Sequence, residues 1–185
     1  MTSPTDHEAA IALLRERIRD VPGHPNPDVV FKDITPLLAD PVAFGHLVEL
    51  LADVCVRLGA TKIVGVEARG FILGAPVAVR ARVGFVPARK AGKLPGPVLS
   101  RPYDLAYGSG VIELKDDALA PHDRVLVIDD VLASGGTAEA VLHLIRATGA
   151  TVAGLAVLLE LGFLDGRARL EPTLAGAALH ALMSV

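Results

Sequence analysis

The sequence predicts an α/β fold with a central, mostly parallel sheet flanked by helices. Apolar runs expected as strands alternate with segments expected as helices: strands at 62–66, 84–88, 124–128 and 151–159, and helices at 70–82 and 137–148. Uninterrupted apolar strands that alternate with helices are typical of parallel sheets covered on both faces. No linker-like segment divides the 185 residues. We therefore expect residues 1–185 to form one domain with a buried core.

The two ends of the chain carry further predicted elements. Residues 8–20 have apolar side chains at helical spacing, and the three prolines within 22–27 then predict an extended loop. A second helix is expected from Asp40 to Gly59, because aspartate followed by proline is a favourable helix start and glycine a natural stop. The apolar run 174–185 is expected as a buried strand or helix, since about 20 residues are needed to cross a bilayer.

Composition excludes several classes of partner. The net charge of -3 gives no general attraction to nucleic acid or to an anionic membrane, so we expect neither as a partner. The first residues lack the basic-then-apolar order of a signal peptide, and the single cysteine, Cys55, cannot form an internal disulfide. A cytoplasmic location is therefore expected. The six histidines show no metal-ligand spacing, so no protein metal ligand is assigned directly.

The strongest motif is an apolar strand that runs directly into Asp129 and Asp130 and continues through a small glycine-containing loop into a helix. Ligands of open α/β sheets bind beyond the carboxyl ends of the strands. The carboxylates can accept hydrogen bonds from sugar hydroxyls. The backbone amides and hydroxyls that follow, at Ala133, Ser134, Gly135, Gly136 and Thr137, suit a phosphate at a helix N-terminus. A ribose 5-phosphate satisfies both halves of this motif.

Two common nucleotide motifs are missing from the sequence. It contains no G-x-x-x-x-G-K-[ST], and the loop after Asp130 has no lysine for a terminal phosphate. It also contains no G-x-G-x-x-G after a first strand. Residues 89–110 form a different kind of segment, rich in proline, glycine and basic side chains. A segment of this length inside a compact domain is usually functional, and its composition suits a mobile lid that meets an anion, although a solvated hairpin would read similarly.

The run Val-Ile-Asp-Asp-Val-Leu-Ala-Ser-Gly-Gly-Thr at 127–137 resembles the signature of the type I phosphoribosyltransferases. Four other runs are similar to segments of the adenine branch of that family, in the same order: Val-Phe-Lys-Asp-Ile-Thr-Pro at 30–36, Glu-Ala-Arg-Gly-Phe at 67–71, Arg-Lys-Ala-Gly-Lys-Leu-Pro-Gly-Pro at 89–97, and Tyr-Asp-Leu-Ala-Tyr-Gly at 103–108. The resemblance covers roughly residues 8 to 170. It implies a type I phosphoribosyltransferase fold with a small N-terminal hood in residues 1–36 and a flexible lid loop at 89–110.

The resemblance also implies an activity and roles for particular residues. The activity is transfer of a phosphoribosyl group from phosphoribosyl pyrophosphate to adenine, with Mg²⁺ carried on the phosphoribosyl pyrophosphate. The resemblance also implies a homodimer, in which the arginine at the position of Arg89 can come from the other subunit. The implied roles are adenine binding by Val30, Phe31 and Lys32, pyrophosphate binding by Glu67, Ala68, Arg69, Arg89, Lys90 and Lys93, and catalysis by Asp129, Asp130, Arg69 and Tyr107. By the same likeness, the Glu67–Ala68 peptide is expected to be cis.

One position departs from the family pattern. The family's return strand reads Tyr-x-Leu-Glu-Tyr-Gly, and its glutamate is taken to assist proton transfer at the base, whereas this chain has Ala106. Asp104 lies two residues away, which along a strand is about 6.6 Å. Ala133 stands where the oxopurine branch has aspartate, which favours adenine. Two alternatives stay open: a phosphoribosyltransferase for another base, and a nucleotide-binding regulator of the same fold without turnover.

Overall fold

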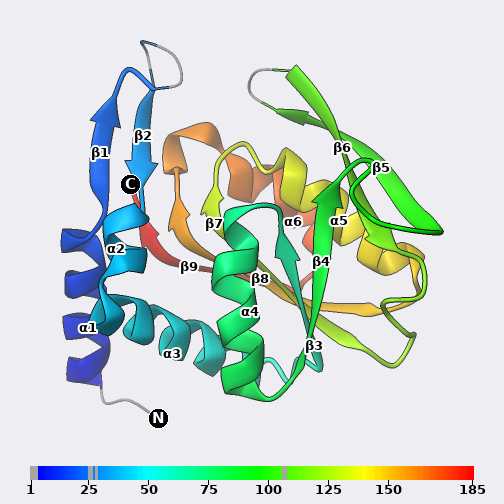
Figure 1. Cartoon of the computed structure of the whole chain (residues 1–185), viewed down its shortest axis with the longest axis horizontal. Helices are drawn as coiled ribbons and strands as arrows, with labels where there is room; N and C mark the ends of the chain where they lie inside the picture. The colour runs from blue at the N-terminus through cyan, green and yellow to red at the C-terminus, as the bar shows by residue number, and fades with distance from the viewer. Residues whose placement is uncertain (1–3, 25–26, 28, 106–107) are drawn as a thin grey trace. The chain divides into compact units, whose positions relative to one another are not determined.

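The computed structural model describes residues 4–24, 27, 29–105 and 108–185, and it contains two compact units, Met1–Leu51 and Ala52–Val185 (Figure 1). The helix α3 (Pro41–Arg57) begins in the first unit and ends in the second. The expected single domain over residues 1–185 stays a prediction.

The first unit contains two short helices and a two-stranded sheet in addition to the start of α3. Its elements are α1 (Pro4–Glu16), β1 (Arg19–Pro22), β2 (Val30–Asp33) and α2 (Thr35–Ala39). The strands pair antiparallel, with Val21 opposite Phe31, so the proline-rich segment expected as a loop begins inside a hairpin. Asp40 caps α3 as expected: its Oδ1 accepts hydrogen bonds from the amides of Val42 (2.9 Å) and Ala43 (3.1 Å).

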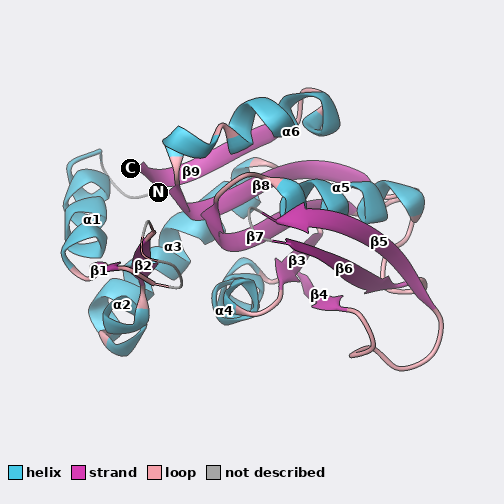
Figure 2. Ribbon diagram, turned by 90° about the horizontal axis from the view of Figure 1, so that it is seen from above, coloured by secondary structure: helices cyan, strands magenta, loops and turns pink. Residues whose placement is uncertain are grey.

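The second unit contains a mixed sheet with helices on both faces. Its elements are β3 (Lys62–Val66), α4 (Arg69–Ala81), β4 (Gly84–Lys90), β5 (Val98–Leu105), β6 (Gly108–Lys115), β7 (Arg124–Leu132), α5 (Gly136–Ala147), β8 (Thr151–Glu160), the 3-10 helix η1 (Gly162–Leu164), α6 (Gly166–Leu174) and β9 (Ala178–Ser184). The described strands follow the order β5-β6-β4-β3-β7-β8-β9, and all neighbours from β4 to β9 are parallel. Helix α4 covers one face and α5 and α6 the other (Figure 2). The predicted α/β class and mostly parallel sheet are confirmed.

The core of this unit forms where apolar strands meet the apolar face of α5. Val64, Val127 and Leu155 lie on β3, β7 and β8 and are fully buried, as are Val141 and Ile145 of α5. Side chains on both faces of these strands are buried because helices cover both faces, which explains why the strand sequences are apolar without alternation. The expected strand or helix at 174–185 is the edge strand β9.

The described residues of the segment 89–110 are more regular than the expected loop. Arg89 and Lys90 end β4, and β5 pairs with β6 in an antiparallel hairpin. The buried carboxylate of Glu113, on β6, accepts hydrogen bonds from the amide of Gly92 (2.9 Å) and the hydroxyl of Ser100 (3.3 Å). These bonds tie the start of the segment to the hairpin. The mobility of this lid stays a prediction.

The order of the strands predicts a ligand site at the carboxyl ends of β3, β4 and β7. The chain leaves β3 toward β4 on one side, while β7 pairs with the other side of β3. Such a change of direction is the point at which open α/β sheets bind ligands, outside the carboxyl ends of the strands. The residues at these ends are Glu67 after β3, Lys90 at the end of β4, and Asp129 and Asp130 near the end of β7.

Candidate active site

Two adjacent carboxylates lie near the end of β7. Asp130 is buried, and its side chain pairs with the Nε of Arg69, at the start of α4. The amide of Asp130 donates a hydrogen bond of 2.9 Å to Oδ1 of Asp129. Burial and the neighbouring carboxylate of Asp130 raise the pKa of Asp129 well above its usual range. Hydroxyl donors or a cation placed at this pair would relieve that unfavourable concentration of negative charge.

The segment after β3 approaches this carboxylate pair closely. The Glu67–Ala68 peptide is cis, as the resemblance implied. A Cβ placed on Gly70 would come within 2.6 Å of the carbonyl oxygen of Ile128 and 3.2 Å of Oδ1 of Asp129. Only a glycine allows the first turn of α4 to pack this close to the end of β7. The predicted pyrophosphate and ribose segments are therefore adjacent.

The loop between β7 and α5 has the geometry of an anion-binding turn. Gly135 has a φ of 83°, in the left-handed region that favours glycine, and it precedes the first residue of α5. Among the described residues no side chain caps this helix. The amides of its first turn therefore face the site with the positive end of the helix dipole, which suits a phosphate group.

A second part of the site is cationic and is organised around Glu67. Its carboxylate accepts hydrogen bonds from Nζ of Lys93 (2.6 Å), the amide of Lys90 (2.8 Å) and Nη2 of Arg89 (3.5 Å). The guanidinium of Arg89 also lies 5.9 Å from the centre of the Phe71 ring. These donors outweigh the effect of burial and lower the pKa of Glu67 to about 2. Three of the predicted pyrophosphate residues thus converge on a single anion of the protein.

One donor in this group lacks a partner. Among the described residues nothing accepts a hydrogen bond from the buried Nε of Arg89. A buried guanidinium N–H without an acceptor is unfavourable, and such exceptions call for a ligand or water. An incoming anionic oxygen would satisfy it.

A pocket of about 410 Å³ connects the carboxylates, the cationic group around Glu67 and the loop at 133–137, called the phosphate loop below. The residues that line it are Glu67, Ala68, Arg69, Lys90, Tyr103, Asp129, Asp130, Val131, Ala133 and Thr137. Eight of these ten were predicted from the sequence as site residues. Tyr103 and Val131 were missed as site residues, although Tyr103 stands in one of the quoted family segments and Val131 directly follows the acid pair.

Not every predicted site residue lies in the second unit. Val30, Phe31 and Lys32 lie on β2 in the first unit, where the ring of Phe31 packs edge-on against His24 at 5.2 Å. Lys32 pairs with Asp20 at 2.8 Å. The role of these three residues at the base stays a prediction. Ala106 and the predicted catalytic residue Tyr107 lie outside the described residues.

The carboxylate of Glu67 should make stability depend on pH in the acidic range. Its pKa is lowered from 4.5 in the unfolded chain to about 2 in the folded protein, so its stabilisation is present above pH 4.5 and is lost as the pH falls toward 2. Lys93 is half-exposed, so solvent screening reduces the effect to about 1–2 kcal/mol. Urea unfolding from pH 6 to pH 3 should show a shallower loss of stability for Glu67→Gln than for the wild type. Glu171→Gln, at an exposed carboxylate, should follow the wild type. Parallel curves for all three proteins would contradict the arrangement around Glu67.

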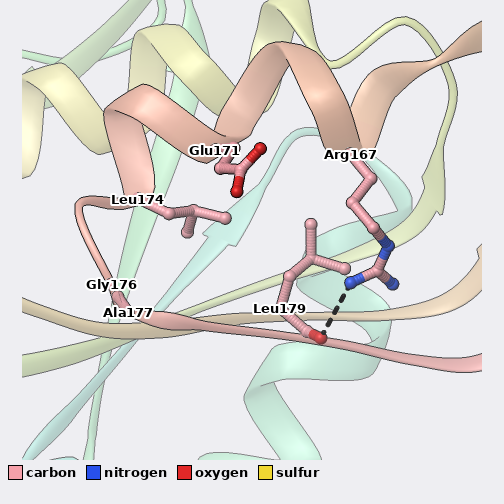
Figure 3. A pocket seen from close by; sticks show the side chains of 6 residues that line it. All are labelled: Arg167, Glu171, Leu174, Gly176, Ala177 and Leu179. Carbon is pink, nitrogen blue, oxygen red and sulfur yellow. Dashed lines mark hydrogen bonds between the residues drawn. The ribbon is translucent and has the colours of Figure 1, made fainter.

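A second pocket, of about 360 Å³, lies between α6 and β9 (Figure 3). Arg167 projects from α6, and its Nη1 donates a hydrogen bond of 3.4 Å to the carbonyl oxygen of Leu179 on β9. Its Nε donates a bond of 2.9 Å to the buried carboxylate of Glu160, at the end of β8. Arg167 therefore joins α6 to β8 and to the edge strand β9.

Within the described ranges, no group of three or more histidine, cysteine, aspartate or glutamate side chains could hold a metal ion. In the same part of the chain, no helix is long and apolar enough to cross a membrane.

Comparison with known proteins places this geometry in a family. The family model described as phosphoribosyl transferase domain matches residues 47–177. The adenine phosphoribosyltransferase of Streptomyces clavuligerus is 70% identical over 94% of this chain and 96% of its own, and that of Streptomyces coelicolor is 66% identical over the full length of both. The solved adenine phosphoribosyltransferase of Rhodothermus marinus is 44% identical and superposes with a TM-score of 0.88, covering 96% of this chain and 99% of that one. This chain belongs to the adenine phosphoribosyltransferase family, within the type I phosphoribosyltransferases.

Proposed function

We propose that this protein transfers the phosphoribosyl group of phosphoribosyl pyrophosphate to adenine, giving AMP and pyrophosphate in purine salvage. The observation that carries the proposal is the meeting of three groups in one pocket. Asp129 and Asp130 stand near the end of β7, the uncapped amides of α5 follow them, and Arg69 is paired with Asp130. A ribose with phosphates at both ends needs all three.

The ribose 5-phosphate would lie along the end of β7. The carboxylates accept hydrogen bonds from the 2′ and 3′ hydroxyls, and the loop 133–137 holds the 5′-phosphate through backbone amides and the hydroxyls of Ser134 and Thr137. Binding hydroxyl donors at Asp129 favours its charged form, which opposes the raised pKa of the free protein. In this orientation the anomeric carbon of the ribose would lie beside the cationic group around Glu67.

The leaving pyrophosphate would replace Glu67 as the partner of the cationic group. Lys93 and Arg89 already point at an anion, and the unpartnered Nε of Arg89 offers one more donor. The carboxylate oxygens of Asp129 and Asp130 also fit Mg²⁺ that arrives with the substrate. Asp129 and Asp130 are hard oxygen ligands, and Mg²⁺ usually keeps waters and substrate phosphates with only one or two protein carboxylates. When bound, Mg²⁺ would neutralise charge on the pyrophosphate.

The reaction breaks the bond between the anomeric carbon and the pyrophosphate oxygen and forms a bond from that carbon to a ring nitrogen of adenine. The electron pair of the broken bond leaves with pyrophosphate, and the nitrogen loses its proton. Positive charge develops on the ribose as the bond breaks, and the carboxylates of Asp129 and Asp130 stabilise it. Closure of the segment 89–110 would exclude water, which would otherwise capture the ribose.

Adenine would bind at Val30, Phe31 and Lys32, with Phe31 stacked on the ring and the backbone around it reading the amino edge. Lys32 is paired with Asp20, which leaves recognition to the backbone and the aromatic ring. A homodimer belongs to the same proposal on the basis of the family likeness. A cytoplasmic location belongs to it on the basis of the first residues, which lack a signal-peptide pattern, and of the single cysteine. Arg89 already contacts Glu67 of its own chain, so the cationic group does not require a second subunit to form.

A panel of bases tests the choice of substrate. The full-length protein is supplied with phosphoribosyl pyrophosphate, Mg²⁺ and one base at a time, and pyrophosphate release is followed. We expect release with adenine, and release at least about 10²-fold slower with hypoxanthine, guanine, xanthine or uracil, since a site built to hydrogen-bond one base leaves polar groups unpaired with another. Comparable rates with an oxopurine would contradict adenine specificity.

Ala106 offers a separate test of catalysis. If the family's glutamate is needed for proton transfer, Ala106→Glu should raise kcat by more than about tenfold, because general acid–base help is typically worth about 10²–10⁴. We expect a modest gain and a shifted pH profile, since electrostatic stabilisation supplies the larger part and Asp104 or water can take the proton. Asp104→Ala should lower kcat if Asp104 is the substitute. Binding without turnover in the natural protein, together with activity in Ala106→Glu, would instead identify a nucleotide-binding relative that has lost catalysis.

A further inference from the structure

The first residue of α6, Gly166, packs directly against the backbone of the phosphate loop. A Cβ placed on Gly166 would overlap the carbonyl oxygen of Ala133 and lie 3.2 Å from the amide nitrogen of Gly135. In the other direction, a Cβ on Gly135 would lie 3.0 Å from the carbonyl oxygen of Gly166. Two backbones therefore touch directly. Arg167 also joins α6 to Glu160 of β8 and to the carbonyl oxygen of Leu179 on β9, the bond drawn in Figure 3. The loop therefore packs against α6 at Gly135 and against the carbonyl oxygen of Asp104, on β5, at Gly136.

The first turn of α5 carries a negative charge that opposes phosphate binding. Glu139 lies in that turn, one helical turn from Gly136. An acidic side chain at a helix N-terminus competes with an anionic ligand for the same positive potential. Unless it is neutralised, Glu139 would therefore weaken any phosphate held by the loop.

Arg169 of α6 supplies the neutralising charge. Its Nε donates a hydrogen bond of 2.9 Å to Oε2 of Glu139, and its Nη2 lies 2.9 Å from the same oxygen. Its remaining nitrogen, Nη1, would be 3.5 Å from a Cβ placed on Gly136, the first residue of α5. The guanidinium thus contacts the acidic side chain of Glu139 and lies close to the first residue of α5. Thr173, one turn further along α6, approaches the other oxygen of Glu139 at 3.5 Å.

We propose that Arg169 is a positioning residue for the 5′-phosphate of the substrate. It neutralises Glu139, directs positive charge at the amino end of α5, and joins α6 to the loop that holds the phosphate. This inference rests on the proposed function for the identity of the ligand. It assigns to the segment after β8, which sequence reasoning left without a role, a direct part in substrate affinity.

The test measures binding of two small ligands, ribose 5-phosphate and inorganic pyrophosphate, to the full-length protein by calorimetry. Arg169→Gln leaves Glu139 unopposed and should weaken ribose 5-phosphate about three- to tenfold while changing pyrophosphate less than about twofold. Arg169→Lys should retain most of the affinity. In turnover assays Arg169→Gln should raise the KM for phosphoribosyl pyrophosphate with kcat within about twofold, as expected when ground-state and transition-state binding are lost equally.

Variants at Glu139 distinguish the effect of the charge of Arg169 from the effect of its packing. Glu139→Gln should bind ribose 5-phosphate as tightly as the wild type or more tightly, and the double variant Glu139→Gln with Arg169→Gln should return to within about threefold of the wild type. A role in packing alone would leave the double variant as weak as Arg169→Gln. Arg146→Gln is the matched control, because Arg146 bridges α5 to the carbonyl oxygen of Leu174 at the opposite end of the helix (3.2 Å).

The outcomes distinguish the two proposals. A wild-type protein that binds no ribose 5-phosphate would overturn the proposed function. Wild-type binding that Arg169→Gln leaves unchanged, or a double variant that stays weak, would overturn only the role of Arg169.

Discussion

Replacing Asp129 and Asp130 together by asparagine is expected to lower kcat/KM by about 10²–10⁴ while the fold stays intact. Each carboxylate is a charged acceptor, and losing one such hydrogen bond is worth about 1.5–3 kcal/mol. The pair therefore corresponds to about 3–6 kcal/mol of ribose binding and transition-state stabilisation, at one factor of ten per 1.36 kcal/mol. The change is nearly isosteric and removes the repulsion between adjacent charges. Arg69 loses its charged partner, but its side chain is 40% exposed and can be solvated, so the fold should stay intact.

The chain contains a matched control for this variant. Asp116 and Asp117 are also adjacent carboxylates, but both are exposed and follow β6. Asp116→Asn with Asp117→Asn should leave kcat/KM within about twofold of the wild type, as is usual for surface substitutions. Steady-state assays with urea unfolding of both double variants separate catalysis from stability. Near wild-type kcat/KM in the first variant would show that the ribose does not bind at β7.

The raised pKa of Asp129 adds a pH dependence to the same experiment. A carboxyl group with a raised pKa takes up its proton at a higher pH than an ordinary aspartate, and the protonated form no longer stabilises positive charge on the ribose. Activity should therefore fall as the pH decreases through that pKa, and the single variant Asp129→Asn should lose this limb of the profile.

The second large effect is expected at Gly166, where alanine should raise the KM for phosphoribosyl pyrophosphate by about 10–100-fold. The added Cβ would overlap the carbonyl oxygen of Ala133, and a backbone atom cannot move aside as a side chain can. Either α6 or the phosphate loop must shift, and a displacement of about 1 Å at a substrate site can cost about 10² in rate. Overpacking of this kind also destabilises the fold by about 1–3 kcal/mol.

Gly162 provides the comparison for Gly166. A Cβ on Gly162, at the start of η1, would meet its nearest atom, the carbonyl oxygen of Val185, at an ordinary 3.8 Å. Gly162→Ala should therefore keep the wild-type KM and lose little stability. Steady-state kinetics give the KM for phosphoribosyl pyrophosphate of the two variants, and thermal unfolding gives their stability. Equal KM values for Gly166→Ala and the wild type would mean that α6 does not support the loop.

The parts of the fold that the sequence predicted are those whose signal is local. The run 125–128 of β7 is apolar without interruption and is bounded by charged residues. Helix α5 begins at a glycine pair and ends at Ala147, two residues before Gly149, whose φ is 84°. The aspartate before α3 acts as a cap within three residues of itself. In each case the residues that determine the structure are neighbours in the chain.

The elements that were missed depend on distant partners. α6 contains Pro172 and has no clear apolar periodicity, so its sequence does not distinguish it from a loop. It is held in place by Glu160 and by backbone contact at Ala133, which no local pattern reveals. The family likeness implied a return strand from Tyr103, at the end of β5. The earlier part of β5 contains Pro102 and gains its structure from pairing with β6.

The candidate site divides in the same way. The carboxylates and the glycine loop could be predicted because a strand end, an acid pair and a helix start coincide within thirteen residues at 125–137. The arrangement of Arg89, Lys90 and Lys93 around Glu67 could not, since it joins segments that are 22 to 26 residues apart. The neutralisation of Glu139 by Arg169 spans 30 residues and gave no signal in the sequence.

Product stoichiometry is the most direct measurement of the central claim, which is that this pocket joins adenine to phosphoribosyl pyrophosphate. The purified protein is incubated with adenine, phosphoribosyl pyrophosphate and Mg²⁺, and AMP and pyrophosphate are quantified by chromatography at several times. The account predicts that the two products appear in equal amounts, that both require adenine, and that the variant with asparagine at 129 and 130 forms neither at a comparable rate. Pyrophosphate released without adenine, or the absence of AMP from a protein that binds ribose 5-phosphate, would contradict it.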